Sequence, residues 1–241
     1  METLRREDKI SNNKTVKVGM YMSLIIGLLY IFIGILLPAD PAERYRGEEF
    51  FRQIAEHGTI PHTWRMMFTV IGILTVFWVA SMSTIIEKKV KKYSGFYKGV
   101  MVIGYAGAAV SAMEWYRELF LMKNYMVSYA DADDVYQLIC QLSSVGVDPN
   151  FIWKFGGLGM WYFLSCLMVQ REHIFSKAVN CLGIIAGLDL VASMIFAMTD
   201  TIVYFPNGMQ MTVMQMTALL GGVLGGIYHI CMFFELKKSK I

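Results

Sequence analysis

The chain has 241 residues, of which 56% are hydrophobic and 17% charged, and its mean hydropathy is +0.46. A typical soluble domain carries about 25% charged residues, so this composition excludes an ordinary soluble protein. The formal net charge of +3 comes from basic residues in short segments between apolar runs. Such segments signal membrane topology, and no nucleic-acid partner is expected.

Six apolar windows are each long enough to cross a bilayer, which takes about 20 predominantly apolar residues. They cover residues 18–37, 66–86, 97–119, 152–169, 178–198 and 211–234. We therefore predict one domain over residues 1–241, an all-α polytopic membrane bundle of six transmembrane helices. No small-residue cleavage site follows the first window, so we interpret it as a retained helix and not as a signal peptide.

Lysine and arginine are distributed unevenly among the segments between these windows. The N-terminal segment, the second and fourth connections and the C-terminal tail are rich in them, whereas "TDTIVYFPNGMQ" contains none. Basic residues remain on the cytoplasmic side of transmembrane helices. We therefore predict a multi-pass protein of the cell membrane with its N-terminus and C-terminus both cytoplasmic. Six helices agree with this, because an even number places both ends of the chain on the same side.

Two long outer loops, residues 39–63 and 123–151, are each predicted to contain a short amphipathic helix. In "DPAERYRGEEFFRQIAEHG", Asp40 suits the N-cap, Pro41 the first helical position and Gly58 the end. In "DADDVYQLICQLSSVG", the acidic start favours a helix N-terminus. Loops of this length are more often functional than simple connections, and these two helices could cover the outer end of the bundle.

Small residues gather where helices are expected to touch. The segments "GYAGAAVSA", "FGGLGMW" and "GGVLGGIYH" lie in the third, fourth and sixth windows. Small residues at regular spacing let helix backbones approach closely, so we predict helix packing at these places. Alternatively, the glycines at 222–226 could form a contact between two copies of the chain in a homo-oligomer.

Ionisable residues inside the windows are expensive in a bilayer and therefore mark candidate sites. Asp189 lies twelve residues after Lys177, which at about 1.5 Å per residue is near the bilayer midplane. Glu114 lies roughly 22 Å along the third window, in the outer third of the membrane core. Arg117 follows Glu114 at i+3 and is predicted to pair with it. We predict that Glu114, Arg117 and Asp189 form an acidic pocket with one arginine, or else a structural ion pair.

Three further residues are assigned to this ligand-binding site. Lys154 begins the fourth window and could complete the pocket, while Trp115 and Tyr105 could line it. The alternative for the aromatic rings is the interfacial belt. His229, the one histidine in the sixth window, is expected to be a hydrogen-bonded packing residue. The cysteines form no CxxC pair, and neither a cofactor nor a metal is predicted.

The segment "FGGLGMWYFLSCLMVQREHIFSKAVNCLGIIAGLDLVASM" and the loop end "IAEHGTIPHTWRMMFTVIGIL" follow a recognisable pattern. It is a Gly-rich fourth helix, a short inside turn and a Gly-rich fifth helix. In this pattern the chain resembles a bacterial family of six-helix integral membrane proteins of unknown function. The resemblance implies a six-helix fold and no activity.

The leading functional hypothesis is a protein that binds or transports a small amphiphilic or lipid-like ligand in an outward-facing polar pocket. Membrane lipids and such a ligand are the expected partners. One alternative is a non-catalytic subunit that recognises a membrane protein partner. Another is a membrane-embedded enzyme using Glu114 or Asp189 as an acid or base. No nucleophile–base pair, metal cluster or phosphate loop is visible in the sequence, so we do not favour an enzyme.

Overall fold

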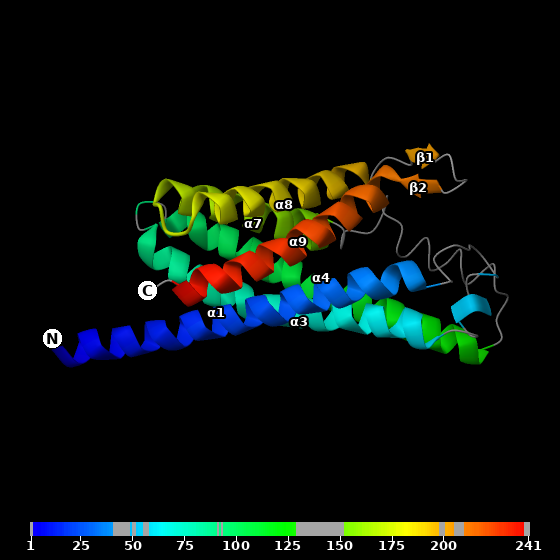
Figure 1. The fold of residues 1–241 in the computed structure, drawn as a ribbon, viewed down its shortest axis with the longest axis horizontal. Helices are drawn as coiled ribbons and strands as arrows, with labels where there is room; N and C mark the ends of the chain where they lie inside the picture. Colours follow the sequence, from blue (N-terminus) through cyan, green and yellow to red (C-terminus); the bar gives the residue numbers. More distant parts are fainter. Residues whose placement is uncertain are drawn as a thin grey trace.

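The computed structural model describes residues 2–40, 49, 52–54, 58–90, 92, 94–128, 152–197, 201–204 and 210–238. Helices dominate these residues (Figure 1). In chain order they are α1 (Glu2–Leu36) with the 3-10 turn η1 (Leu37–Ala39), α3 (Thr59–Lys89), α4 (Ser94–Ser128), the π-helical η4 (Ile152–Gly157), α7 (Leu158–Arg171), α8 (Lys177–Phe196) and α9 (Val213–Lys238).

Six of the described helical segments are long and apolar enough to cross a membrane. They are Lys14–Ala39, Thr59–Lys89, Ser94–Arg117, Ile152–Arg171, Lys177–Phe196 and Met216–Lys238. Each overlaps one predicted window, which confirms a multi-pass membrane protein. The outer surface is correspondingly apolar, with Phe32, Phe77 and Val102 each more than half exposed. Lipid tails accommodate such side chains, whereas a soluble monomer rarely exposes apolar patches of this kind.

The helices extend beyond the apolar windows because hydropathy does not detect polar helical ends. Helix α3 begins at Thr59, with Pro61 in its first turn, where the fixed φ of proline is tolerated. Helix α4 continues to Ser128, into the predicted outer loop. Of the predicted helix before Gly58, only Glu49 and residues 52–54 are described, and they are helical. The predicted helix at 131–146 lies outside the described residues.

The described residues confirm the predicted all-α class and add a short β-hairpin that was not predicted. Strand β1 (Ile202–Tyr204) pairs antiparallel with β2 (Gln210–Thr212), with Val203 opposite Met211. The β-branched residues of β1 favour an extended backbone. The intervening sequence contains Pro206, Asn207 and Gly208, residue types that are common in hairpin turns. This hairpin joins α8 to α9.

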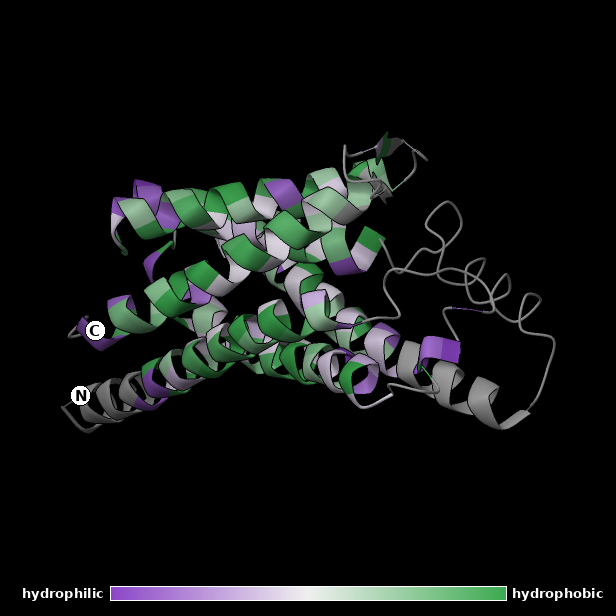
Figure 2. Cartoon of the chain, turned by 45° about the vertical axis from the view of Figure 1, so that its right-hand side comes forward, coloured by the Kyte–Doolittle hydropathy of each residue, from purple (hydrophilic) through white to green (hydrophobic). Residues whose placement is uncertain are grey.

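The six long helices form a closed ring in chain order. Helix α1 packs on α3, α3 on α4, α4 on η4 and α7, α7 on α8, α8 on α9, and α9 returns to α1. Successive helices run in opposite directions, so the start of α1 and the end of α9 lie together (Figure 1). We call this the proximal end and the opposite one the distal end. Apolar residues occupy the middle of the helices and hydrophilic ones lie mainly near their ends (Figure 2).

Glycines allow the closest helix contacts, as predicted. A Cβ atom added to Gly187 of α8 would lie 2.7 Å from the carbonyl oxygen of Gly159 in α7. A Cβ added to Gly226 of α9 would lie 2.9 Å from Cβ of Tyr30 in α1. Since Tyr30 packs within the same chain, this part of the glycine-rich face of α9 is used for the α1–α9 contact.

Candidate functional site

A buried ion pair joins α4 to η4 near the distal end. The Lys154 ammonium lies 3.1 Å from Oε1 of Glu114, and both side chains are 8% exposed. Glu114 stands seven residues, or about two helical turns, after Gly107 on the same face of α4. A Cβ at Gly107 would lie 2.6 Å from the Trp153 carbonyl oxygen. The bare glycine therefore lets η4 approach α4, and the approach brings Lys154 to Glu114.

Aromatic rings surround the Lys154 ammonium on its other sides. Its Nζ atom lies 4.2 Å from the ring centroid of Trp115 and 5.2 Å from that of Phe155. Trp115 in turn stacks on Phe68 of α3, with centroids 4.5 Å apart and an interplanar angle of 11°. Cation–π contacts are strongest when the cation is desolvated. Among the described residues, one carboxylate oxygen and two ring faces therefore stabilise the lysine charge.

A second buried ion pair lies on the other side of the aromatic rings. Arg65 Nη1 in α3 is 3.6 Å from Oδ2 of Asp40, and both residues are almost fully buried. The Trp64 indole N–H donates to the same Asp40 oxygen at 2.7 Å, and the Arg65 guanidinium lies over the Trp64 ring at 3.9 Å. The Trp64 ring contacts Trp115 edge-on at 5.8 Å. The two ion pairs are therefore connected through aromatic contacts.

We call this arrangement the distal cluster. Its members are Asp40, Trp64, Arg65, Phe68, Glu114, Trp115 and Lys154. The structure thus brings together three of the predicted site residues, Glu114, Trp115 and Lys154. Sequence reasoning assigned Asp40 to a helix N-cap and did not place it in a site. Trp64 and Phe68, which share one face of α3 at i and i+4, are the signal that could have indicated the rest of the cluster.

One oxygen of the distal cluster has no hydrogen-bond partner in the described part of the chain. Lys154 pairs with Oε1 of Glu114, whereas Oε2 is buried and unpaired among the described residues. Buried polar atoms in native proteins nearly always have a partner, so each exception calls for an explanation. A carboxylate oxygen can only accept a hydrogen bond. The cluster therefore offers a buried acceptor to a donor that approaches it.

Asp189 lies at a different helix interface. Its Oδ2 atom is buried, has no partner among the described residues, and faces α9. A Cβ added to Gly221 would lie 2.8 Å from this oxygen. Glu114 instead faces η4. The contacts therefore place Asp189 between α8 and α9, outside the distal cluster.

The two remaining predicted site residues lie on α4. Tyr105 is nine residues before Glu114, which corresponds to about 13 Å along the axis and about 180° around it. It is half-buried against the bundle core, on another face of the helix. Arg117 is half-buried one turn beyond Glu114, and its pairing with Glu114 stays a prediction.

A second buried network surrounds His229 in the middle of the bundle. The Tyr162 hydroxyl lies 2.7 Å from Nε2 of His229, which is 1% exposed. The ring of Tyr30 stacks near the imidazole, and that of Trp78 meets it edge-on. Trp78 also donates to Ser23 at 2.7 Å. His229 is therefore a hydrogen-bonded packing residue that joins α7, α9, α1 and α3, as predicted.

No protein-family model matches the chain, and no significant match is found among curated proteins or solved structures. The resemblance to a six-helix family of unknown function therefore stays an expectation.

Proposed function

We propose that the protein binds a small amphiphilic or lipid-like ligand through an ammonium group, with Glu114 as the principal acceptor. The observation that carries this proposal is the buried Oε2 atom of Glu114, which lacks a partner among the described residues. A protonated amine supplies the hydrogen-bond donor and the positive charge that such an oxygen favours. The ammonium group could stand alone or form part of a zwitterion.

The chemistry of Lys154 favours a cationic group over a simple anion. The lysine ammonium already has Glu114 Oε1 at 3.1 Å and the Trp115 ring at 4.2 Å. Among the described residues, it is therefore the carboxylate, and not the lysine, that still needs a hydrogen-bond partner. The two ion pairs of the distal cluster also have no net formal charge. A zwitterionic ligand would preserve that balance, which matters because an uncompensated charge is expensive at this depth.

The aromatic members of the cluster support an amphiphilic ligand. Phe68 and Trp115 are stacked and lie directly beside the ion pair of Glu114. Aromatic faces bind both alkyl groups and ammonium groups. A ligand with an apolar chain next to its charged group would match both kinds of surface.

The distribution of charge supports an outward-facing site. Basic residues gather at the proximal end, at the ends of α3, α7 and α9 and the starts of α4 and α8. Those described there include Lys88, Lys89, Lys98, Arg171, Lys177, Lys237 and Lys238. By the positive-inside rule this end and both chain termini would be cytoplasmic, in the cell membrane. The distal cluster would then lie towards the outside.

A transport function would add proton coupling at Asp189. Its carboxylate lies between α8 and α9, with Oδ2 against Gly221, so it is separated from the ligand group at Glu114. Intramembrane carboxylates at such positions carry protons in many pumps and transporters. Binding at Glu114 and proton coupling at Asp189 are therefore separable parts of the proposal.

The test is a binding titration on the purified protein in lipid nanodiscs, with decylamine as a cationic probe and decanoate as its anionic counterpart. Wild type should bind decylamine in preference to decanoate. The Glu114→Gln variant should lose this preference, whereas Glu87→Gln, which removes a carboxylate at the proximal end of α3, should retain it.

A second variant separates loss of binding from loss of folding. Glu114→Gln alone leaves Lys154 buried without its carboxylate, which can unfold the protein. The double variant Glu114→Gln with Lys154→Met removes both charges and keeps the site neutral. A folded double variant that still binds decylamine like wild type would refute the proposed role of Glu114.

A further inference from the structure

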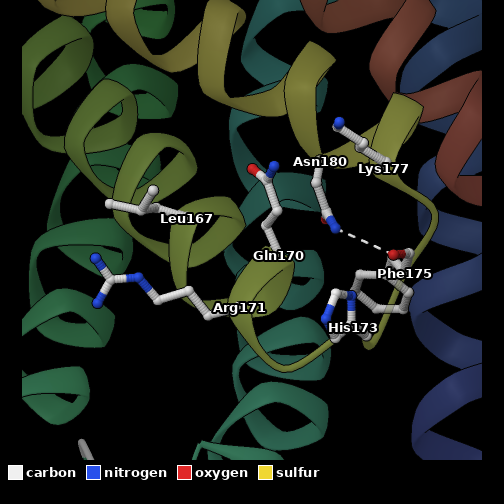
Figure 3. Close-up of a pocket in the computed structure, with 7 residues that line it drawn as sticks. All are labelled: Leu167, Gln170, Arg171, His173, Phe175, Lys177 and Asn180. Carbon is white, nitrogen blue, oxygen red and sulfur yellow. Dashed lines mark hydrogen bonds between the residues drawn. The ribbon is translucent and has the colours of Figure 1, made fainter.

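A cavity opens at the proximal end, in the connection between α7 and α8 (Figure 3). Its volume is about 430 Å³, within the range of roughly 300–1,000 Å³ that ligand pockets occupy. The residues that line it are Leu167, Gln170, Arg171, His173, Phe175, Lys177 and Asn180. This cavity is far from the distal cluster, at the other end of the helices, so it is a separate feature of the fold.

The rim of the cavity is basic, and none of the described residues that line it is acidic. Arg171, His173 and Lys177 are all exposed. Figure 3 shows Gln170 and Asn180 between Arg171 on one side and Lys177 on the other. Exposed guanidinium and ammonium groups on opposite sides of one opening are suited to a phosphate group.

The start of α8 adds backbone donors to the same place. Helix α8 begins at Lys177, and Ser176 makes no side-chain capping hydrogen bond. The backbone N–H of Ser176, the N-cap residue, donates to the Glu235 carboxylate at 2.7 Å, so this N–H already has an acceptor. The N–H groups of the first helical turn remain without an intrahelical acceptor. Such groups bind anions because the helix dipole adds partial positive charge there.

Asn180 supplies an acceptor at the buried side of the cavity. The residue is 1% exposed, and its Nδ2 group donates to the carbonyl oxygen of Phe175 at 3.1 Å. Its Oδ1 atom is buried and has no partner among the described residues. A simple phosphate ion carries its hydroxyl only on the phosphorus atom, so it has no second group to reach this oxygen while its charge stays at the basic rim. A phosphate ester with a hydroxyl-bearing head group would satisfy the basic rim and Asn180 together.

Apolar residues indicate where the remainder of such a ligand would lie. Leu167 and Phe175 line the cavity beside the polar residues. Leu167 is one turn deeper along α7 than Arg171, towards the middle of the membrane span. A phospholipid places its phosphate at this interface and its acyl chains along the apolar part of the helix, whereas a soluble ester has no such chain.

We propose that this cavity binds the phosphate ester head group of an anionic glycerophospholipid. Arg171, Lys177 and the first turn of α8 bind the phosphate, and Asn180 Oδ1 accepts a hydrogen bond from a head-group hydroxyl. Phosphatidylglycerol has this chemistry. The site is independent of ligand binding at Glu114 and goes beyond the proposed function.

The test measures retention of phosphatidylglycerol and phosphatidylcholine by native mass spectrometry of the purified protein in mixed micelles. Wild type should retain phosphatidylglycerol preferentially. Arg171→Gln with Lys177→Gln should weaken its retention roughly 30-fold, as expected for two interfacial cations. The matched control is Lys237→Gln with Lys238→Gln, which removes the same charge at the same end without touching the cavity. Equal weakening by the control pair would overturn the proposal, because it would indicate general surface attraction.

Two further experiments test which head group is bound and whether it belongs to a lipid or to a soluble phosphate ester. Asn180→Leu should reduce retention of phosphatidylglycerol several-fold, as the loss of one hydrogen bond predicts, and leave phosphatidic acid unchanged. An equal effect on both lipids would contradict the role of Asn180. Soluble glycerol phosphate at millimolar concentration should not displace the lipid. Its displacement would contradict the lipid assignment and identify a free phosphate ester as the ligand of the same cavity.

Discussion

Lys154 and Glu114 form a buried ion pair between η4 and α4, with Nζ 3.1 Å from Oε1. The lysine has its carboxylate and two aromatic rings, whereas the second oxygen of the carboxylate has no partner among the described residues. This asymmetry distinguishes the pair from a simple structural clamp, in which both charges would be fully satisfied. It also determines how variants of the two residues should behave.

Replacing Lys154 by Met should destabilise the protein strongly. The change leaves Glu114 buried without a cation, and breaking one partner of a buried ion pair costs about 3–5 kcal/mol. Adding Glu114→Gln should recover most of this loss, since the pair is then neutral. Thermal unfolding in detergent micelles would measure both. Additive losses in the double variant would show that the two side chains do not act as a pair.

Trp64→Phe should weaken the attachment of Asp40 to α3. The Trp64 indole N–H donates to Asp40 Oδ2 at 2.7 Å, and both groups are buried. Removing the donor should lower the free energy of unfolding by about 1–3 kcal/mol, because the carboxylate loses a hydrogen bond that water cannot replace. Titration of unfolding with dodecyl sulfate would detect it. Trp153→Phe is a suitable control, because the Trp153 side chain is exposed. A loss no larger than in that control would contradict this description.

Gly187→Ala should separate α7 from α8. The added Cβ would lie 2.5 Å from the backbone nitrogen of Phe163, and overpacking of this kind costs roughly 1–3 kcal/mol. Gly34→Ala provides the opposite expectation, because no described atom lies within 4 Å of a Cβ at that position. In the interior of α1, alanine should stabilise the helix by about 0.5–1 kcal/mol. Comparing the melting temperatures of the two variants tests the packing directly, and a tolerated Gly187→Ala would refute the close contact.

His173→Gly should increase stability slightly. His173 has a φ of 53°, and it follows the end of α7 where Ile174 N–H donates to Val169 O and His173 N–H to Gln170 O. This is the Schellman arrangement, whose left-handed residue is usually glycine. A non-glycine residue pays an energetic penalty in the left-handed conformation, and glycine removes it. This gain should exceed the cost of the greater backbone entropy that glycine loses on folding by up to about 1 kcal/mol. His173→Ala, which keeps the penalty, should not gain. A melting temperature that falls in the glycine variant would contradict this reasoning.

The six membrane segments could be predicted from the sequence because each is a continuous apolar run, a local property. The glycine-mediated contacts were predictable for the same reason. The partner of a buried charge was not predictable in this way. Asp40 lies close to Trp64 and Arg65 only because η1 and the start of α3 meet at the distal end, and this long-range contact leaves no local pattern.

The orientation of each helix within the ring depends on packing that the sequence shows only weakly. Helix α8 is apolar on nearly every side of Asp189, so the sequence does not reveal which neighbour the carboxylate faces. The structure directs it to Gly221 of α9, and directs Glu114 to η4. The β-hairpin was missed because strands of three residues are too short to show alternation.

A ligand site at Glu114 is tested most directly by identifying what remains bound to the purified protein, by native mass spectrometry of wild type and of the Glu114→Gln, Lys154→Met double variant. We expect a discrete amine-bearing or zwitterionic amphiphile on wild type that is missing from the folded double variant. We also expect Arg171→Gln with Lys177→Gln to retain this molecule. The same bound species, in the same amount, on wild type and on the double variant would contradict a ligand site at Glu114.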